Sequence, residues 1–176
     1  LPLQKEKIDS VSLIHFRVIR CIVDTINGQQ RFLLLVKTAN GNVLFNYFPA
    51  TGNLVPFVPQ GFKKEDFRKG YTNIVKAGSG KYWISTLYNG MIYVDGSGPA
   101  IQYASTQKNT DKKIPDGEIV DFTMTADNDL WLLMRDKGLV HISIYNKDVQ
   151  YREIFAEKEG LTNNSLYDIV HDPERN

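Results

Sequence analysis

The stretch KYWISTLYNGMIYVDG, residues 81–96, contains two short apolar runs joined by a polar link that ends in glycine. Apolar runs rich in aromatic and β-branched residues on either side of an Asn-Gly pair are typical of a β-hairpin. Looser versions of the pattern occur in RFLLLVKTANGNVLFNY, residues 31–47, and in DLWLLMRDKGLVHIS, residues 129–143. The chain of 176 residues therefore repeats one β-rich unit.

The copies can be aligned on recurring residues. Each link ends in a glycine: Gly41, Gly90 and Gly138. Seven residues before each glycine lies an apolar anchor residue: Leu34, Trp83 and Trp131. A polar marker lies ten positions before each anchor, and a fourth copy of it follows the last unit: Asp24, Asn73, Asp121 and Asp168. The units therefore recur every 47–49 residues, and we expect the chain to stop inside a fourth repeat.

A period of this length, with four short strands in each unit, is typical of a β-propeller blade. The blades fall at about 18–58, 71–105 and 119–155, with the start of a further blade at 166–176. We therefore predict an all-β fold, in which residues 1–176 are a segment of one propeller domain. This partial β-propeller would contain about three and a third four-stranded antiparallel blades. A β-sandwich is the alternative, but the repeated register favours the propeller.

The composition argues against several classes of function. The chain carries 21 basic and 20 acidic residues, so there is no electrostatic reason to expect binding to nucleic acid or to an anionic membrane. The single cysteine, Cys21, excludes an intrachain disulfide and a multi-thiolate metal site. No apolar run approaches the roughly 20 residues that span a bilayer.

Three segments resemble a known repeat family. The stretch GLTNNSLYDIVHDPERN (160–176) is similar to the start of the two-component regulator propeller repeat, and YTNIVKAGSGKYWISTLYNGMIYVD (71–95) is similar to its middle. The segment IVDFTMTADNDLWLLMRDKGLVHI (119–142) keeps the Trp-Leu and Gly-Leu pairs of that repeat. The sequence departs from the family pattern at three positions: Leu34, Ser85 and Leu133.

The resemblance implies a location, a partner and a ligand. Such repeats form the extracytoplasmic sensor region of membrane-bound hybrid two-component regulators, in which propellers are followed by a membrane helix, a histidine kinase and a DNA-binding output. In carbohydrate-foraging bacteria they often recognise breakdown products of complex glycans. The resemblance therefore implies a periplasmic location, the remainder of a parent receptor chain as partner, and an oligosaccharide as ligand. Kinase activity would belong to the parent chain, so we expect this chain not to be an enzyme.

A ligand site is expected at one end of the blades. The links between second and third strands emerge at the end where the longer loops converge over the central channel, and loops at such an end usually carry binding. The candidate ligand-binding residues are Tyr88, Asn89, Arg135, Asp136 and Lys137. Tyr88 can stack on the apolar face of a sugar, and the planar fork of Arg135 can hold a carboxylate or neighbouring hydroxyls. The alternative is that these side chains lie in solvent-exposed turns and bind no ligand.

The other polar residues favour structural roles. The acids in HDPE (171–174) and DND (127–129) occupy predicted turns and match neither a zinc site nor an EF-hand, so we expect no metal and no cofactor. Three of the polar markers, Asn73, Asp121 and Asp168, could ring a pore entrance, but we favour a role in capping backbone N–H groups of the neighbouring blade. Both tryptophans are expected in the core between blades.

Three functions are compatible with the sequence. The first is ligand sensing by a signalling receptor, the second is a protein-interaction or scaffolding propeller, and the third is a propeller polysaccharide lyase or hydrolase. An enzyme needs an acid–base pair or a metal cluster at the channel, and the sequence offers no candidate set. Because a partial propeller leaves sheet edges and apolar faces open, we also expect the chain to self-associate.

Overall fold

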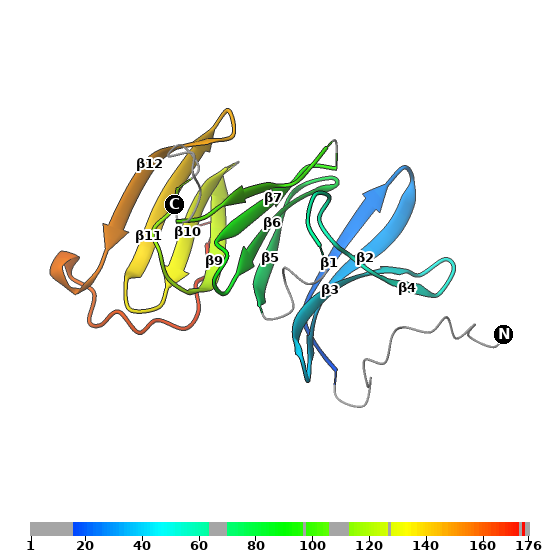
Figure 1. The fold of residues 1–176 in the computed structure, drawn as a ribbon, viewed down its shortest axis with the longest axis horizontal. Helices are drawn as coiled ribbons and strands as arrows, with labels where there is room; N and C mark the ends of the chain where they lie inside the picture. The colour runs from blue at the N-terminus through cyan, green and yellow to red at the C-terminus, as the bar shows by residue number, and fades with distance from the viewer. Residues whose placement is uncertain are drawn as a thin grey trace.

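The computed structural model describes residues 16–63, 70–96, 98–105, 113–126, 128–172 and 174, and its strands form three antiparallel sheets (Figure 1). In each sheet four strands follow one another in chain order. The first sheet contains β1 (Arg17–Ile26), β2 (Gln29–Thr38), β3 (Gly41–Phe48) and β4 (Asn53–Pro56). The second contains β5 (Tyr71–Gly78), β6 (Lys81–Thr86), β7 (Met91–Val94) and β8 (Ile101–Tyr103). The third contains β9 (Ile119–Ala126), β10 (Asp129–Met134), β11 (Gly138–Tyr145) and β12 (Asp148–Phe155), and a 3-10 helix, η4 (Glu157–Glu159), follows it.

Tight turns set the register of two hairpins. The β1–β2 turn contains Asn27 and Gly28, with φ angles of 51° and 76°, and the β11–β12 turn contains Asn146 and Lys147, with φ angles of 50° and 69°. Two successive residues with positive φ form the kind of turn whose twist matches that of the flanking strands. Asparagine and glycine adopt this conformation more readily than other residues, so the sequence encodes these hairpins locally.

The sheets lie side by side and enclose two apolar cores (Figure 1). Between the first and second sheets, Leu33 and Leu35 of β2 pack with Tyr82 and Ile84 of β6. Between the second and third sheets, the core is formed by buried residues that include Trp83, Tyr103, Phe122, Leu130 and Leu132. Alternate residues of β6 therefore pack into different cores, because successive side chains of a strand point to opposite faces. The prediction of an all-β fold of four-stranded antiparallel units is confirmed.

The glycine alignment holds for the second and third sheets. Trp83 and Trp131 each lie three residues before the end of their strand. Trp83 is fully buried, whereas Trp131 is only partly buried and stacks on His141 and Phe155, with ring centroids 4.2 and 5.7 Å away. Within the described residues, no further sheet packs over that face of the third sheet. The prediction that both tryptophans lie in a core between units is therefore correct for Trp83 and wrong for Trp131.

For the first sheet the alignment is wrong by one residue. β2 ends at Thr38, so the residue three positions before its end is Leu35, and Leu35 is the one that packs between the sheets. Leu34 lies on the opposite face of β2. The link before the aligned glycine contains two residues here, 39–40, and three residues, 135–137, in the third sheet. Because side chains alternate between the faces of a strand, a difference of one residue assigns the anchor to the wrong face.

The marker alignment is also wrong for Asp24. Asp24 pairs with Arg31 beside the β1–β2 turn, whereas Asn73 and Asp121 lie near the starts of β5 and β9, away from the turns that follow those strands. The cause is the length of the first hairpin, since β2 has 10 residues whereas β6 and β10 have 6 each. A marker counted back from the anchor therefore falls closer to the turn in the first sheet.

Candidate functional site

The predicted ligand-binding residues lie in links at one end of the second and third sheets. Tyr88 and Asn89 belong to the β6–β7 link, and residues 135–137 form the β10–β11 turn. The side chain of Tyr88 is 67% exposed. Two of the five predicted residues are brought together, because Tyr88 and Arg135 both contact the carboxylate of Glu118.

Glu118 joins the two links. The Tyr88 hydroxyl donates a hydrogen bond to the Glu118 carboxylate, and Nε of Arg135 donates another to its Oε2. The backbone N–H of Arg135 also donates to the Glu118 carbonyl, at 2.9 Å. The hydrogen bond from Tyr88, and after it the interactions with Arg135, lower the pKa of Glu118, and the same bond raises the pKa of Tyr88. At neutral pH the cluster is therefore a carboxylate, a guanidinium and a protonated phenol whose charges cancel.

The other three predicted residues make separate contacts. The Asn89 carbonyl accepts a hydrogen bond from Nε2 of Gln102 at 2.9 Å. Asp136 is an exposed turn residue with a φ angle of 59°. Lys137 is partly buried beside Gly117, where its Cε would lie 3.2 Å from an added Cβ. Whether any of these residues binds a ligand stays a prediction.

Sequence reasoning did not identify Glu118. It lies one residue before β9 and 13 residues before Trp131. The residue at the same distance before Trp83 is Gly70, so the repeat gives no signal at this position. Glu118 becomes part of the cluster only because the second and third sheets pack together, which brings the β6–β7 link beside the start of β9.

A polar row crosses from sheet to sheet along the inner strands β1, β5 and β9. Nε of Arg20 donates to Oδ1 of Asn73 at 3.0 Å, and Nδ2 of Asn73 donates to Oδ1 of Asp121. The same Nδ2 donates to the Phe122 carbonyl at 3.2 Å. Asp121 in turn shares a hydrogen bond with Asp168, which follows the third sheet. The markers Asn73 and Asp121 therefore have a structural role, although the backbone group that Asn73 satisfies in the next sheet is a carbonyl and not an N–H.

The row places two carboxyl groups next to each other. Burial, and after it the hydrogen bond with Asp168, raises the pKa of Asp121. The Phe122 N–H, the Asn73 amide and the charge of Arg20 act in the opposite direction and only partly offset the rise. Asp168 lies in a segment without strand structure, where Tyr167 and Val170 are exposed. That segment is therefore held to the third sheet in part through a carboxyl that resists ionisation.

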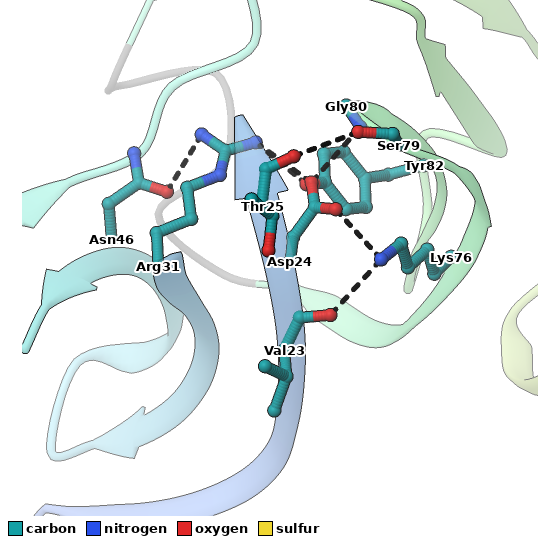
Figure 2. A network of polar contacts seen from close by, with 9 residues as sticks. All are labelled: Val23, Asp24, Thr25, Arg31, Asn46, Lys76, Ser79, Gly80 and Tyr82. Atoms are coloured by element: carbon teal, nitrogen blue, oxygen red, sulfur yellow. Dashed lines mark hydrogen bonds and ion pairs between the residues drawn. The ribbon is translucent and has the colours of Figure 1, made fainter. Parts of the chain in front are cut away.

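A second network joins the first and second sheets near the β1–β2 turn (Figure 2). The buried Asp24 carboxylate accepts hydrogen bonds from the Gly80 N–H, at 3.0 Å, and from the Tyr82 hydroxyl. Nζ of Lys76 lies 2.7 Å from Oδ1 of Asp24 and also donates to the Val23 carbonyl. Figure 2 shows Lys76, Gly80 and Tyr82 of the second sheet converging on Asp24, with Arg31 of the first sheet beside it. The network fixes the turn of the second sheet against the first.

The Asp24 network keeps its carboxylate ionised. Burial would raise the pKa of Asp24, but hydrogen bonds from Lys76, Tyr82 and backbone N–H groups outweigh it and lower the pKa to about 2. Burial and the hydrogen bond to Asp24 raise the pKa of Tyr82 to about 12. Arg31 adds a second cation, with Nη2 3.8 Å from Oδ2 of Asp24 and 2.7 Å from the Tyr82 hydroxyl.

In the described part of the chain, no group of three or more His, Cys, Asp or Glu side chains is placed to hold a metal ion. Of the helical segments among those residues, none has the length and apolar character needed to cross a membrane.

The chain matches no protein-family model and no curated protein. Its fold is similar to a crystal structure of the extracellular domain of BT3049 from B. thetaiotaomicron, a protein described as a hybrid two-component system. The TM-score is 0.54, the sequence identity is 21%, and the likeness covers 82% of this chain. This chain spans 20% of the BT3049 chain in that structure. At this level of identity the comparison establishes likeness of fold.

Proposed function

We propose that the chain is part of a β-propeller in the sensor region of a membrane-bound hybrid two-component receptor, outside the cytoplasm and in the periplasm. The observation that carries the proposal is the likeness in fold, over 82% of the chain, to the extracellular domain of a protein described as such a system. The two-component regulator propeller repeat, which residues 71–176 resemble, points the same way. Kinase activity would belong to other parts of the receptor, and we propose none for this chain.

The arrangement of the sheets supports the propeller. All three have four strands in chain order, and each packs face to face with its neighbour through an apolar core. The polar row from Arg20 through Asn73 to Asp121 links the first strands of successive sheets, the strands that line the channel in a propeller. In this arrangement the Trp131 face of the third sheet is the place for the next blade.

The ligand that we propose is an oligosaccharide, bound at the end that carries Tyr88, Glu118 and Arg135. An exposed aromatic ring beside a carboxylate and a guanidinium offers a stacking surface together with acceptors and donors for hydroxyl groups. A double variant, Tyr88→Ala with Arg135→Ala, should lose affinity for a sugar that binds the wild-type chain in calorimetry. Tyr145→Ala is the matched control, since Tyr145 is 68% exposed and lies in the third sheet at the start of the β11–β12 turn. Equal affinity in the wild type and the double variant would remove this end from consideration.

The receptor assignment has its own test in the gene. We expect the reading frame that continues from Asn176 to encode a membrane-spanning helix followed by histidine-kinase motifs. A stop codon shortly after Asn176 would contradict the assignment and would favour an interaction or scaffolding propeller.

We also propose that the isolated chain self-associates. Val18, Ile19 and Val23 of β1 are 44%, 43% and 52% exposed, and the Trp131 face has no covering sheet in the described residues. Exposed apolar surfaces at the two ends of a row of sheets favour contacts between copies. Light scattering tests this expectation, and a monodisperse monomer at all concentrations would rule it out.

A further inference from the structure

A groove lies between the first and second sheets, at the end opposite to Tyr88. It has a volume of about 510 Å³ and is bounded by the β1–β2 turn, the β5–β6 turn and the residues that follow β7. Its lining includes Ile26, Asn27, Arg31, Phe57, Ser79 and Asp95. Pockets that bind small molecules commonly have volumes of about 300–1,000 Å³, so the groove is large enough for a ligand.

Arg31 is the anchored polar group of this groove. Its guanidinium lies over the rings of Phe57 and Tyr82, 6.0 and 5.4 Å from their centroids. Nη1 donates to Oδ1 of Asn46 at 3.3 Å, and Nη2 donates to the Tyr82 hydroxyl. Nε is buried and has no hydrogen-bond partner in the described part of the chain, so it is not a donor that a ligand in the groove can reach. Nη1 and Nη2 carry four of the five N–H donors of a guanidinium, and the bonds to Asn46 and Tyr82 use two of these four, so Arg31 is held in place and keeps donors for a ligand.

The charges of the groove cancel. Its lining carries one cation, Arg31, and one anion, Asp95, and the Asp24 carboxylate, which contacts the lining residues Gly80 and Tyr82, lies 2.7 Å from the Lys76 ammonium. An ionic ligand would gain no net attraction here and would lose its hydration. Hydroxyl groups, in contrast, can donate to a carboxylate and accept from a guanidinium.

The apolar and polar parts of the lining suit one class of molecule. Phe57 is partly exposed, and Ile26 adds apolar surface beside it. Asn27 and Ser79 are exposed at the rim and can exchange hydrogen bonds with hydroxyl groups. A sugar ring has an apolar C–H face and hydroxyl groups around its edge, so it can contact both kinds of surface at once.

We propose that this groove binds a neutral carbohydrate, with Phe57 under the ring, Arg31 and Asp95 on its hydroxyl groups, and Asn27 at the rim. The proposal rests on the groove itself and not on the receptor assignment. It is also separate from the Tyr88–Glu118–Arg135 cluster, which lies at the other end of the sheets.

The test uses NMR of the isotope-labelled chain, titrated with neutral malto-, cello-, xylo- and mannohexaose and with a hexameric oligogalacturonide as the acidic probe. We expect at least one neutral sugar, at concentrations up to about 10 mM, to shift the amide signals of Asn27, Gly80 and Gly96. Asn27→Gly should weaken that binding about tenfold without loss of fold, because residue 27 has a positive φ that glycine adopts freely. Asn146→Gly is the matched control, since Asn146 has the same conformation in the β11–β12 turn, and it should leave the affinity unchanged.

Arg31→Lys keeps the positive charge and removes the donor fork, so it should abolish the shifts, with circular dichroism as the check of folding. The proposal is overturned if no neutral sugar shifts the groove amides, if only the oligogalacturonide does, or if Asn27→Gly and Arg31→Lys bind as the wild type does. Shifts confined to Tyr88, Glu118 and Arg135 would also overturn it while supporting the site given under the proposed function. Shifts at the groove that persist in the Tyr88→Ala, Arg135→Ala variant would support the groove as a site separate from that cluster.

Discussion

Trp83 and Trp131 occupy the same place in two successive hairpins, yet one is fully buried and the other is partly exposed. Trp83 packs against Phe122 and Leu130 of the third sheet as well as against its own sheet. Trp131 contacts His141 and Phe155, both from its own sheet. The difference teaches that burial of the anchor residue in this repeat depends on the next sheet along the chain, and a single unit cannot provide it.

The largest effect should come from the two tryptophans themselves. Trp83→Ala removes a fully buried indole between two sheets, so we expect a loss of about 3–5 kcal/mol in the free energy of unfolding. Trp131→Ala should cost about 1–2 kcal/mol, since part of that side chain already contacts water. Urea unfolding of the two variants measures both values. Equal losses would contradict the difference in burial.

A smaller effect should come from Asp24, which joins the first and second sheets. The folded-state pKa, about 2, is below the value of 3.8 expected for an unperturbed carboxyl. Asp24 therefore stabilises the fold above about pH 4, and this contribution is lost as the pH falls toward 2. Thermal unfolding between pH 6 and pH 2 should show a steeper decline for the wild type than for Asp24→Asn. Parallel curves would show that Asp24 is not held as an anion.

The smallest effect should come from Asp121, at the edge where Asp168 meets the third sheet. Its pKa is raised in the fold, so the folded chain holds this proton more tightly than the unfolded chain does. The contribution of Asp121 therefore becomes more favourable as the pH falls through its raised pKa, the reverse of Asp24. Asp121→Asn keeps an acceptor for the Phe122 N–H and should raise stability at pH 7 by less than about 1 kcal/mol. A clear loss of stability at pH 7 would mean that the anion is favoured.

The sequence was sufficient to predict the units and most of their strands. The alternation of apolar and polar residues around Trp83 and Trp131 predicts hairpins that the structure contains at the expected positions. The alignment failed in the first sheet, where the link is one residue shorter and the first hairpin is longer. These lengths shift the anchor Leu34 and the marker Asp24, and neither length can be measured by aligning glycines. Periodicity identifies a strand, but its register against other strands also depends on loop length.

The candidate site was predicted only in part, for a related reason. Tyr88 and Arg135 could be proposed because they lie in the links of two repeats, and the structure does bring them to one carboxylate. Glu118 has no counterpart in the other units and could be found only by packing the sheets together. The groove around Arg31 is likewise formed by residues from two sheets, which no local pattern relates to one another.

We propose that the three sheets are consecutive blades and that Trp131 faces the position of the next one. Acrylamide quenching of single-tryptophan variants tests this directly, because Trp83 and Trp131 are the two tryptophans of the chain. With Trp83→Phe and Trp131→Phe as the two proteins, measured at a concentration low enough for the chain to be monomeric, we expect Trp131 to be quenched much more strongly than Trp83. In a longer chain that includes the next blade of the receptor we propose, Trp131 should become as shielded as Trp83. Trp131 that stays accessible in the longer chain would contradict the account.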